Sequence, residues 1–342
     1  MRIAIHQQKG SFSDRWIPWC RQQGIDTRLV NCYDHDIMGQ LEGCDALMWH
    51  FYHAGAMDVK FARQLLYAVE ASGRRVFPDF RTMWHFDDKV GQKYLLEAVG
   101  APLVPAVVFY SAERARAWAG KAVFPQVFKL RCGAGSDNVR LVAGRRQALR
   151  LIRRAFGRGF PQLDPWHDLK ERWRKFRRGT GTASNVARGV ARLAFPTRFA
   201  RMAGHEKGYV YFQDFIPGND HDIRVVVIGH RAFAIKRMAR EHDFRASGSG
   251  EILYGRENFR EETIRLAFAV AEKLRTQCVA FDFLTHCGQP VIVEISYGFT
   301  PEGYDPCPGY WEKEMTWVPG PFNPYGWMIE EVLQDYKTLT AL

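Results

Sequence analysis

The sequence predicts an α/β protein of two or three sub-domains, and three observations lead to this prediction. The chain has 342 residues, more than one ordinary hydrophobic core accommodates. Strand-like and helix-like segments alternate along residues 1–85, as they do in layered α/β folds. The content of 46% hydrophobic and 25% charged residues is typical of a globular protein, and no run of 18 apolar residues predicts a membrane span.

Residues 1–85 are expected to form an N-terminal α/β domain with a small parallel sheet. The predicted strands are Arg2–His6, Thr27–Cys32, Ala46–His50 and Arg75–Pro78. The predicted helices are Asp14–Gln23, which stops near Gly24, and Met57–Ser72. Because the sequence opens directly on a strand, we expect no signal peptide.

Residues 86–208 and 209–342 are expected to form two further sub-domains. The first is predicted to hold the helices Asp88–Val99 and Ala112–Ala119 and the strands Val107–Tyr110, Gln126–Lys129 and Val139–Leu141. The second is predicted to hold the strands Tyr209–Phe215, Asp222–Val227 and Arg231–Lys236, two later strands, and the helices Glu261–Leu274 and Tyr325–Tyr336. Mixed strands and helices of this kind predict an α+β arrangement in both.

A lysine and a glycine-containing loop form the first candidate binding motif. Lys129 ends a predicted strand, and the following loop carries Gly133, Gly135 and Ser136. Glycines allow the backbone to approach an anion where a side chain would block it, so the motif predicts phosphate binding. Lys89, at the start of a predicted helix, could reach a phosphate too, although taken alone a lysine at a helix start is more often simply solvated.

Two carboxylates form the second candidate motif. Asp282 lies between Phe281 and Phe283, and Glu294 follows three apolar residues, so both are predicted in strands built for burial. An ionised carboxylate in such a strand needs a cationic partner or a metal ion. Two of them on neighbouring strands favour Mg²⁺ over a structural ion pair, because Mg²⁺ prefers carboxylate oxygens.

Two weaker motifs accompany these. The strand-to-turn segment Gln213, Asp214, Phe215, Ile216 can present backbone groups to an adenine, with a plain core strand as the alternative. Arg237 and the loop residue Arg245 carry guanidinium groups, which suit carboxylates and phosphates. A loop of solvated charges is the alternative for the second of these motifs.

The order of these motifs resembles the ATP-grasp superfamily, in particular the ligases that add glutamate to a ribosomal protein. The resemblance covers about residues 86–144 and 207–298 and rests on the stretches Asp88-Lys89, Lys129 with Gly133, Gln213 to Ile216, Asp222-Ile223-Arg224, Arg237, Asp243-Phe244-Arg245, Asp282 and Glu294-Ile295-Ser296. It implies an N-terminal α/β domain followed by two α+β sub-domains that clamp ATP. Residues 145–205 would then be a helical, basic insertion in the mobile lid.

The resemblance also implies a role for each motif. Lys89, Lys129, Gly133, Gly135 and Ser136 would contact the phosphates of ATP. Gln213, Asp214, Phe215 and Ile216 would line the adenine, with Asp222 near the ribose. Asp282, Glu294 and Ser296 would hold Mg²⁺, with Mn²⁺ as a substitute. Arg237 and Arg245 would act on the transferred phosphate or the acyl substrate.

The implied activity is that of an ATP-dependent carboxylate–amine ligase. ATP would phosphorylate a small-molecule carboxylate, and an amine would displace phosphate to form an amide. Two departures from the family pattern are Ser296 and Ser247, each standing where an asparagine is usual. The alternatives are a degenerate homologue that binds a membrane or a polyanion, and a kinase-like enzyme that stops at the phosphorylated product.

The basic character of the chain lies in one segment. Residues 145–205 hold 16 Lys and Arg against three acidic residues, a net charge of +13, which leaves −2 for the rest of a chain whose total is +11. Apolar residues recur there at helical spacing, as in Leu149, Ile152 and Phe156, and in Trp173 and Phe176. Such helices suit an acidic membrane surface, an anionic glycan or, less well, a nucleic acid, whereas ordinary lid helices are the alternative.

The C-terminal region and the cysteines complete the expectations. Residues 296–311 are rich in Gly, Pro and aromatics, which suits an acceptor pocket or core packing. A similarity of this tail to ATP-grasp proteins of surface-polysaccharide gene clusters suggests an uronic-acid or lipid-linked glycan substrate and a role in polysaccharide biosynthesis. The seven cysteines include no CxxC pair, so we expect a cytoplasmic protein, peripheral at the inner membrane face if the basic segment binds lipid. The oligomeric state is not predicted.

Overall fold

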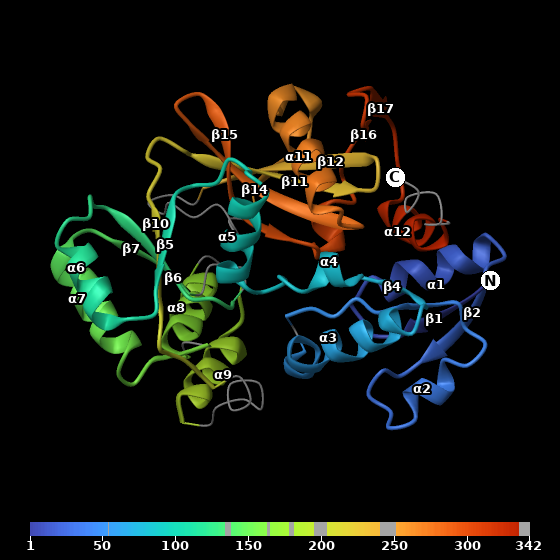
Figure 1. Ribbon diagram of the computed structural model, residues 1–342, viewed down its shortest axis with the longest axis horizontal. Helices are drawn as coiled ribbons and strands as arrows, with labels where there is room; N and C mark the ends of the chain where they lie inside the picture. Colours follow the sequence, from blue (N-terminus) through green and yellow to red (C-terminus); the bar gives the residue numbers. More distant parts are fainter. Residues whose placement is uncertain are drawn as a thin grey trace. The chain divides into compact units, whose positions relative to one another are not determined.

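The computed structural model describes residues 1–53, 55–133, 138–162, 165–177, 181–194, 204–239 and 251–334. The chain groups into two compact units (Figure 1). Unit 1 consists of Met1–Phe86, Leu95–Pro102 and Asn219–Leu342, and unit 2 consists of Asp87–Tyr94 and Leu103–Gly218. The three-part division expected from the sequence stays a prediction.

The first sheet of unit 1 is the parallel sheet predicted for the N-terminal region. Its strands, in the spatial order β2-β1-β3-β4, are β2 (Asp26–Val30), β1 (Arg2–His6), β3 (Ala46–Met48) and β4 (Arg75–Phe77). The helices of this region are α1 (Ser13–Gln22), α2 (Ile37–Gln40), α3 (Ala56–Ala71) and α4 (Phe80–Met83). Strand β1 is apolar and fully buried from Ile3 to Ile5, as expected of a parallel strand covered on both faces.

The second sheet of unit 1 has seven strands, in the order β15-β14-β11-β12-β16-β17 with β13 paired to β12. These strands are β11 (His221–Ile228), β12 (Arg231–Met238), β13 (Ile252–Leu253), β14 (Cys278–His286), β15 (Gln289–Ser296), β16 (Gly309–Glu312) and β17 (Trp317–Pro319). Their pairings are antiparallel. The associated helices are η1 (Arg256–Asn258), α11 (Glu261–Leu274), η2 (Pro301–Gly303) and α12 (Pro324–Leu333).

One hydrophobic core serves both sheets of unit 1. It joins Ile5 and Phe77 of the first sheet to Val226 and Phe233 of the second, all nearly inaccessible to solvent. Helix α12 adds Met328 to this core, and its first turn is capped by the Asn323 side chain, which accepts hydrogen bonds from the N–H groups of Tyr325 and Gly326. The carboxylate-bearing strands are therefore held on a well-packed body.

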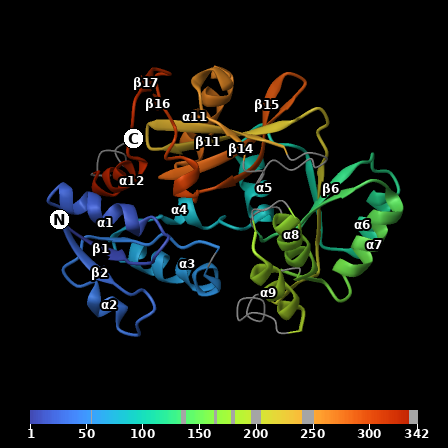
Figure 2. The ribbon, with the colours of Figure 1, turned by 180° about the vertical axis from the view of Figure 1, so that it is seen from behind.

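Unit 2 is built on a four-stranded antiparallel sheet in the order β5-β10-β6-β7. Its strands are β5 (Ala106–Phe109), β10 (Val210–Asp214), β6 (Gln126–Lys129) and β7 (Val139–Val142), and a small pair is formed by β8 (Phe160–Pro161) and β9 (His205–Glu206). The helices with residues in unit 2 are α5 (Lys89–Ala98), α6 (Ala112–Ala119), α7 (Arg145–Ala155), α8 (Pro165–Arg177) and α9 (Ala183–Ala194). Helices α6 and α7 lie side by side (Figure 2), with α6 in contact with β5 and α7 in contact with β7.

The helices predicted for the basic segment are α7, α8 and α9. Helix α7 is part of the unit 2 core, because Ile152 is fully buried with Phe128 and Phe212 of the sheet. Its apolar stripe therefore packs on the body and is not a surface for a partner. Helices α8 and α9 differ from α7, since Trp173, Phe176 and Val190 expose 52%, 40% and 54% of their surface. No helix among the described residues is long and apolar enough to cross a membrane.

Candidate nucleotide and metal sites

Two lysines and a glycine loop lie together in unit 2, as predicted. Lys129 is the last residue of β6, where it pairs with Tyr211 of β10 and Val139 of β7, and it is 5% exposed. Lys89 begins α5; its Nζ donates to the carbonyl of Gly133 at 2.8 Å, and its N–H donates to the carbonyl of Arg131 at 2.9 Å. The structure therefore places Lys89 at the loop that follows Lys129. Gly135 and Ser136 lie outside the described residues.

Gly133 shows why the loop needs a glycine. Its φ of +117° is a conformation that side-chain-bearing residues rarely adopt, and an added Cβ would come within 2.7 Å of Asn138 Nδ2. Its N–H donates to Asp87 Oδ1 at 2.6 Å. The start of the loop is thus held from the α5 side by Asp87 and Lys89.

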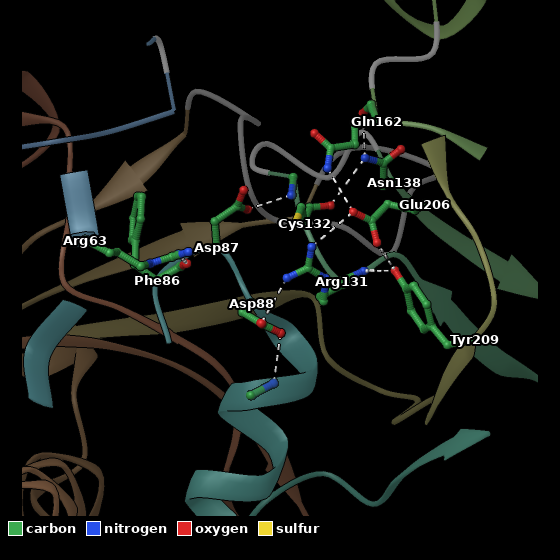
Figure 3. Close-up of polar contacts among 12 residues, drawn as sticks. Arg63, Phe86, Asp87, Asp88, Arg131, Cys132, Asn138, Gln162, Glu206 and Tyr209 are labelled. Carbon is green, nitrogen blue, oxygen red and sulfur yellow. Dashed lines mark hydrogen bonds and ion pairs between the residues drawn. The ribbon is translucent and has the colours of Figure 1, made fainter. Parts of the chain in front are cut away.

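A partly buried polar network that the sequence did not reveal supports this loop (Figure 3). Arg131 donates to Asp88 at 3.1 Å and to Glu206 at 3.4 Å. Glu206 also accepts from Gln162 Nε2 and from the Tyr209 hydroxyl, each at 2.8 Å, and the Arg131 N–H donates to that hydroxyl at 2.6 Å. The chain between these residues is long, so no sequence motif connects them.

The network holds Glu206 as a carboxylate. Burial raises the pKa of Glu206, but the hydrogen bond from Gln162 and the charge of Arg131 outweigh it, so its pKa is lowered. The pKa of Arg131 is raised by neighbouring negative charge in spite of burial. The network is therefore a set of fixed charges that positions the backbone of residues 131–133.

The predicted adenine segment follows the central strand of the unit 2 sheet. Gln213 pairs with Ala106 and Val127 in the ladder and is 2% exposed, whereas Asp214 is exposed and accepts from Gln126 Nε2 at 2.8 Å. The strand ends at Asp214, so Phe215 and Ile216 lie past its end, Ile216 buried and Phe215 half-buried. A plain core strand accounts for the first part of this segment, and the adenine role of its end stays a prediction.

The carboxylate pair of unit 1 has the geometry predicted from the sequence. Asp282 of β14 lies directly opposite Glu294 of β15, and Ala280 lies opposite Ser296. Because side chains two residues apart in a strand share a face, Glu294 and Ser296 project on the same side as Asp282. The Ser296 hydroxyl donates to the carbonyl of Gly298 at 3.3 Å and accepts from its N–H at 3.2 Å.

Two arginines are bound to this carboxylate cluster. Arg224 Nη1 lies 3.1 Å from both oxygens of Asp282, and Arg237 Nη2 lies 2.9 Å from Asp282 Oδ1. Arg237 also forms a two-point contact with Asp222, at 2.6 and 2.7 Å. Asp282 thus has two guanidinium partners, because the neighbouring strand β11 brings Arg224 opposite it, and its metal role stays a prediction. Asp222, expected beside a ribose, is here the partner of Arg237.

The cluster is largely buried, and its charges act on each other. Burial raises the pKa of Asp222, although the charge of Arg237 opposes this. Burial lowers the pKa of Arg224 and Arg237, but the charge of Asp282 more than compensates, so both are raised. Burial also raises the pKa of Tyr304 to about 12, against the opposing charge of Arg224. Arg224 and Tyr304 are site residues that were not selected from the sequence.

The oxygens of this cluster fit a magnesium ion. Mg²⁺ is commonly held by one or two carboxylates together with water and substrate phosphates. Asp282 accepts three contacts from the two arginines, and with Glu294 and the Ser296 hydroxyl it presents the kind of oxygen ligand that Mg²⁺ prefers. Within the described part of the chain, no group of three His, Cys, Asp or Glu residues that could hold a metal ion is found. Arg245 lies outside the described residues.

Solved structures with the same architecture identify the fold. The chain matches D-alanine–D-alanine ligase from Bacillus anthracis complexed with ATP at a TM-score of 0.58, with 12% identity and 97% of each chain covered. It matches a RimK-domain ATP-grasp protein from Sphaerobacter thermophilus at 0.54, with 16% identity and 98% and 100% covered. It also matches the biotin carboxylase domain of Hydrogenobacter thermophilus 2-oxoglutarate carboxylase with MgADP at 0.59, with 16% identity and 98% and 70% covered.

These similarities show that the chain has the ATP-grasp fold, as its motif order predicted. No family model and no curated protein matches the sequence. At identities of 12–16% the structures show the fold alone. The activity must therefore be argued from the residues of this chain.

Proposed function

We propose that this protein is an ATP-dependent carboxylate–amine ligase. The observation that carries the proposal is the pair of buried ammonium groups, Lys89 and Lys129, at a glycine loop whose backbone is held by a charged network. Buried positive charge beside a glycine-containing loop suits phosphate oxygens. ATP-grasp neighbours include a ligase complexed with ATP and a carboxylase domain with MgADP, which supports the choice of nucleotide.

The residues of unit 2 bind and orient the nucleotide in this proposal. Lys89 and Lys129 contact phosphate oxygens, and the loop from Gly133 through Gly135 and Ser136 covers them. Gln213 to Ile216 line the adenine, with the backbone past the end of β10 as the recognition surface. Because these contacts are made by a strand end and a helix start, they hold the phosphates in a fixed direction for transfer.

The residues of unit 1 handle charge on the reacting groups. Asp282, Glu294 and the Ser296 hydroxyl would hold Mg²⁺ or Mn²⁺, which neutralises phosphate charge during transfer to a carboxylate. Asp222 and Asp282 fix the guanidinium of Arg237, and Asp282 fixes that of Arg224, so both arginines are oriented before substrate arrives. They stabilise the negative charge that develops on the acyl oxygen when the amine attacks and phosphate leaves. Arg245 is proposed to assist them.

A catalytically degenerate protein is a second candidate, and two observations favour it. Asp282 is already neutralised by two arginines, and serine replaces the usual asparagine at position 296. A protein of this kind would bind nucleotide, a membrane or a polyanion without turnover.

Product analysis separates these candidates. The full chain is incubated with ATP, Mg²⁺ and a library of acids and amines that includes uronic acids and lipid-linked glycan acids, and products are identified by mass spectrometry. A ligase yields an amide with one ADP and one phosphate for each bond formed. A stable phosphorylated acid without condensation would instead show a kinase. Nucleotide binding with no turnover of any pair would contradict the ligase and support the degenerate protein.

A further inference from the structure

A pocket of about 450 Å³ lies within unit 1, and its lining includes Tyr304, on which the charges of Arg224 and Asp282 also act. It is formed by one face of α1 and by two segments near the C-terminus, residues 304–307 and 321–325. Helices α1 and α12 lie side by side in both views (Figures 1 and 2). The volume is in the range of small-molecule sites, which is about 300–1,000 Å³.

The pocket contains a buried hydroxyl group without a partner. Tyr325 lines the pocket, is 4% exposed, and its hydroxyl makes no hydrogen bond to any described residue. Its ring is fixed between Phe12 and Phe299, with centroid distances of 5.5 and 6.1 Å. Burying an unsatisfied hydroxyl is unfavourable, so a ligand group that reached this hydroxyl would gain from pairing with it.

The polar groups around Tyr325 include both donors and acceptors. Arg15 Nη2 forms an ion pair with Asp305 Oδ2 at 2.7 Å, and the Arg15 guanidinium lies 5.8 Å from the Tyr325 ring centroid. Asp305 raises the pKa of Tyr325, after the larger effect of burial, and Arg15 opposes it, so the hydroxyl lies in the field of both groups. Asp14 adds a second carboxylate to the lining.

This arrangement selects against a strongly charged ligand. One arginine and two aspartates give the lining a net charge of −1, which disfavours a carboxylate or phosphate. A ligand with an ammonium group would be repelled by the positive charge of Arg15. Hydroxyl groups satisfy both kinds of partner, because each can accept from Arg15 or Tyr325 and donate to Asp14 or Asp305.

The walls of the pocket are flat and apolar. Trp19 and Phe322 contribute ring surfaces, and Phe322 is held by stacking on Trp327 at 5.1 Å and an interplanar angle of 10°. We propose that this pocket binds an uncharged sugar ring, with its apolar face against the aromatic wall and its hydroxyls on Arg15, Asp305 and Tyr325. The proposal goes beyond the ligase activity and does not depend on it.

The test measures sugar binding to the full chain without nucleotide, so its outcome is independent of the ligase proposal. Hexoses, N-acetylhexosamines, glucosamine and glucuronate are titrated at millimolar concentrations and followed by calorimetry and ligand-observed NMR. We expect a neutral hexose or N-acetylhexosamine to bind more tightly than glucuronate or glucosamine. Binding of only the charged sugars, or of none, would overturn the proposal.

Two variants locate the binding. Tyr325→Phe and Arg15→Gln should each weaken binding about fivefold, as expected for the loss of one ligand hydrogen bond. Tyr325→Phe should leave the melting temperature unchanged or raised, because the removed hydroxyl has no partner in the described protein. Arg21→Gln on the same helix, outside the pocket lining, is the control and should bind as the native protein does. Equal binding by all three variants would show that this pocket is not the site.

Discussion

Individual side chains in this protein derive their roles from the strands that carry them. Lys129 is the last residue of β6, and its side chain is buried within the protein and not extended into solvent. Asp282 and Arg224 face each other across β14 and β11, which makes their contact a consequence of strand register. At this scale, charge and position together define the candidate site.

Replacing Lys129 tests the phosphate role. Lys129→Met keeps most of the side-chain volume and removes the charge, so the fold should persist while ATP binds at least about tenfold more weakly, the loss expected for one charge-assisted contact. Calorimetry with a non-hydrolysable ATP analogue measures the affinity, and circular dichroism checks the fold. Lys121→Met, at an exposed position outside the motif, is the matched control. Equal affinity of the Lys129 variant and the native protein would refute the assignment.

Neutralising the carboxylate pair tests the metal role. Asp282→Asn combined with Glu294→Gln keeps the side-chain shapes but removes both negative charges, so Mg²⁺-dependent turnover should be abolished. Activity across a Mg²⁺ titration is the measurement, with Glu302→Gln, another acid of unit 1, as the control. Turnover retained by the double variant would remove Asp282 and Glu294 from the mechanism.

Helices α8, α9 and α12 each determine which of their side chains are buried and which are exposed. Helix α12 covers the unit 1 core with one face and places Glu331 in a half-buried position beside Gly229. Helices α8 and α9 pack closely at Gly189, where an added Cβ would come within 2.9 Å of Arg172, yet they leave aromatic residues exposed. Each arrangement leads to a separate prediction.

Glu331 should make the stability of the protein depend on pH. Burial raises the pKa of Glu331 to about 7, with Arg231 opposing, whereas the pKa of a glutamate in the unfolded chain lies near its ordinary value of 4.5. The folded state therefore binds more protons between these values, and the free energy of unfolding should fall as pH rises from 5 to 8, by at most about 3 kcal/mol. Glu331→Gln should flatten this slope in urea unfolding. A native slope that persists in the variant would exclude Glu331 as its source.

The exposed face of α8 and α9 is predicted to bind an acidic lipid surface. Trp173, Phe176 and Val190 are exposed there next to Lys170 and Arg177, and apolar residues within positive charge suit such a surface. Trp173→Ser with Phe176→Ser should reduce sedimentation with vesicles containing phosphatidylserine. Deleting residues 145–205 is a poorer test, because α7 belongs to the unit 2 core.

Two controls make the lipid experiment specific. Vesicles of neutral phosphatidylcholine should bind the native protein weakly, and Tyr67→Ser with Phe80→Ser, an exposed aromatic pair of unit 1, should bind acidic vesicles as the native protein does. Undiminished binding by the Trp173 and Phe176 variant would contradict a lipid role for this face.

At the scale of the whole molecule, an ATP-grasp chain with two self-contained units should be stabilised by its nucleotide. A ligand that binds only the folded state raises stability by about 2.7 kcal/mol at one hundred times its dissociation constant. We expect MgATP to raise the melting temperature in differential scanning fluorimetry, and MgGTP to raise it less if Gln213 to Ile216 recognise adenine. Equal shifts with both nucleotides would contradict an adenine-specific segment.

The sequence by itself determined most elements and the ATP-grasp fold, because strand and helix periodicity, glycine loops and motif order are local properties. It also predicted Asp282 opposite Glu294, which follows from their short spacing and strand pairing, whereas Lys89 and the loop residue Gly133 are 44 residues apart and were linked by the order of the motifs. The tertiary structure alone decided that Arg224 and Arg237 form ion pairs with Asp282 and that Glu206 forms an ion pair with Arg131.

The sugar pocket depends still more on tertiary structure, since Arg15 and Asp305 are 290 residues apart. Partners at such distances are selected by how folded segments pack, and no local spacing encodes that choice.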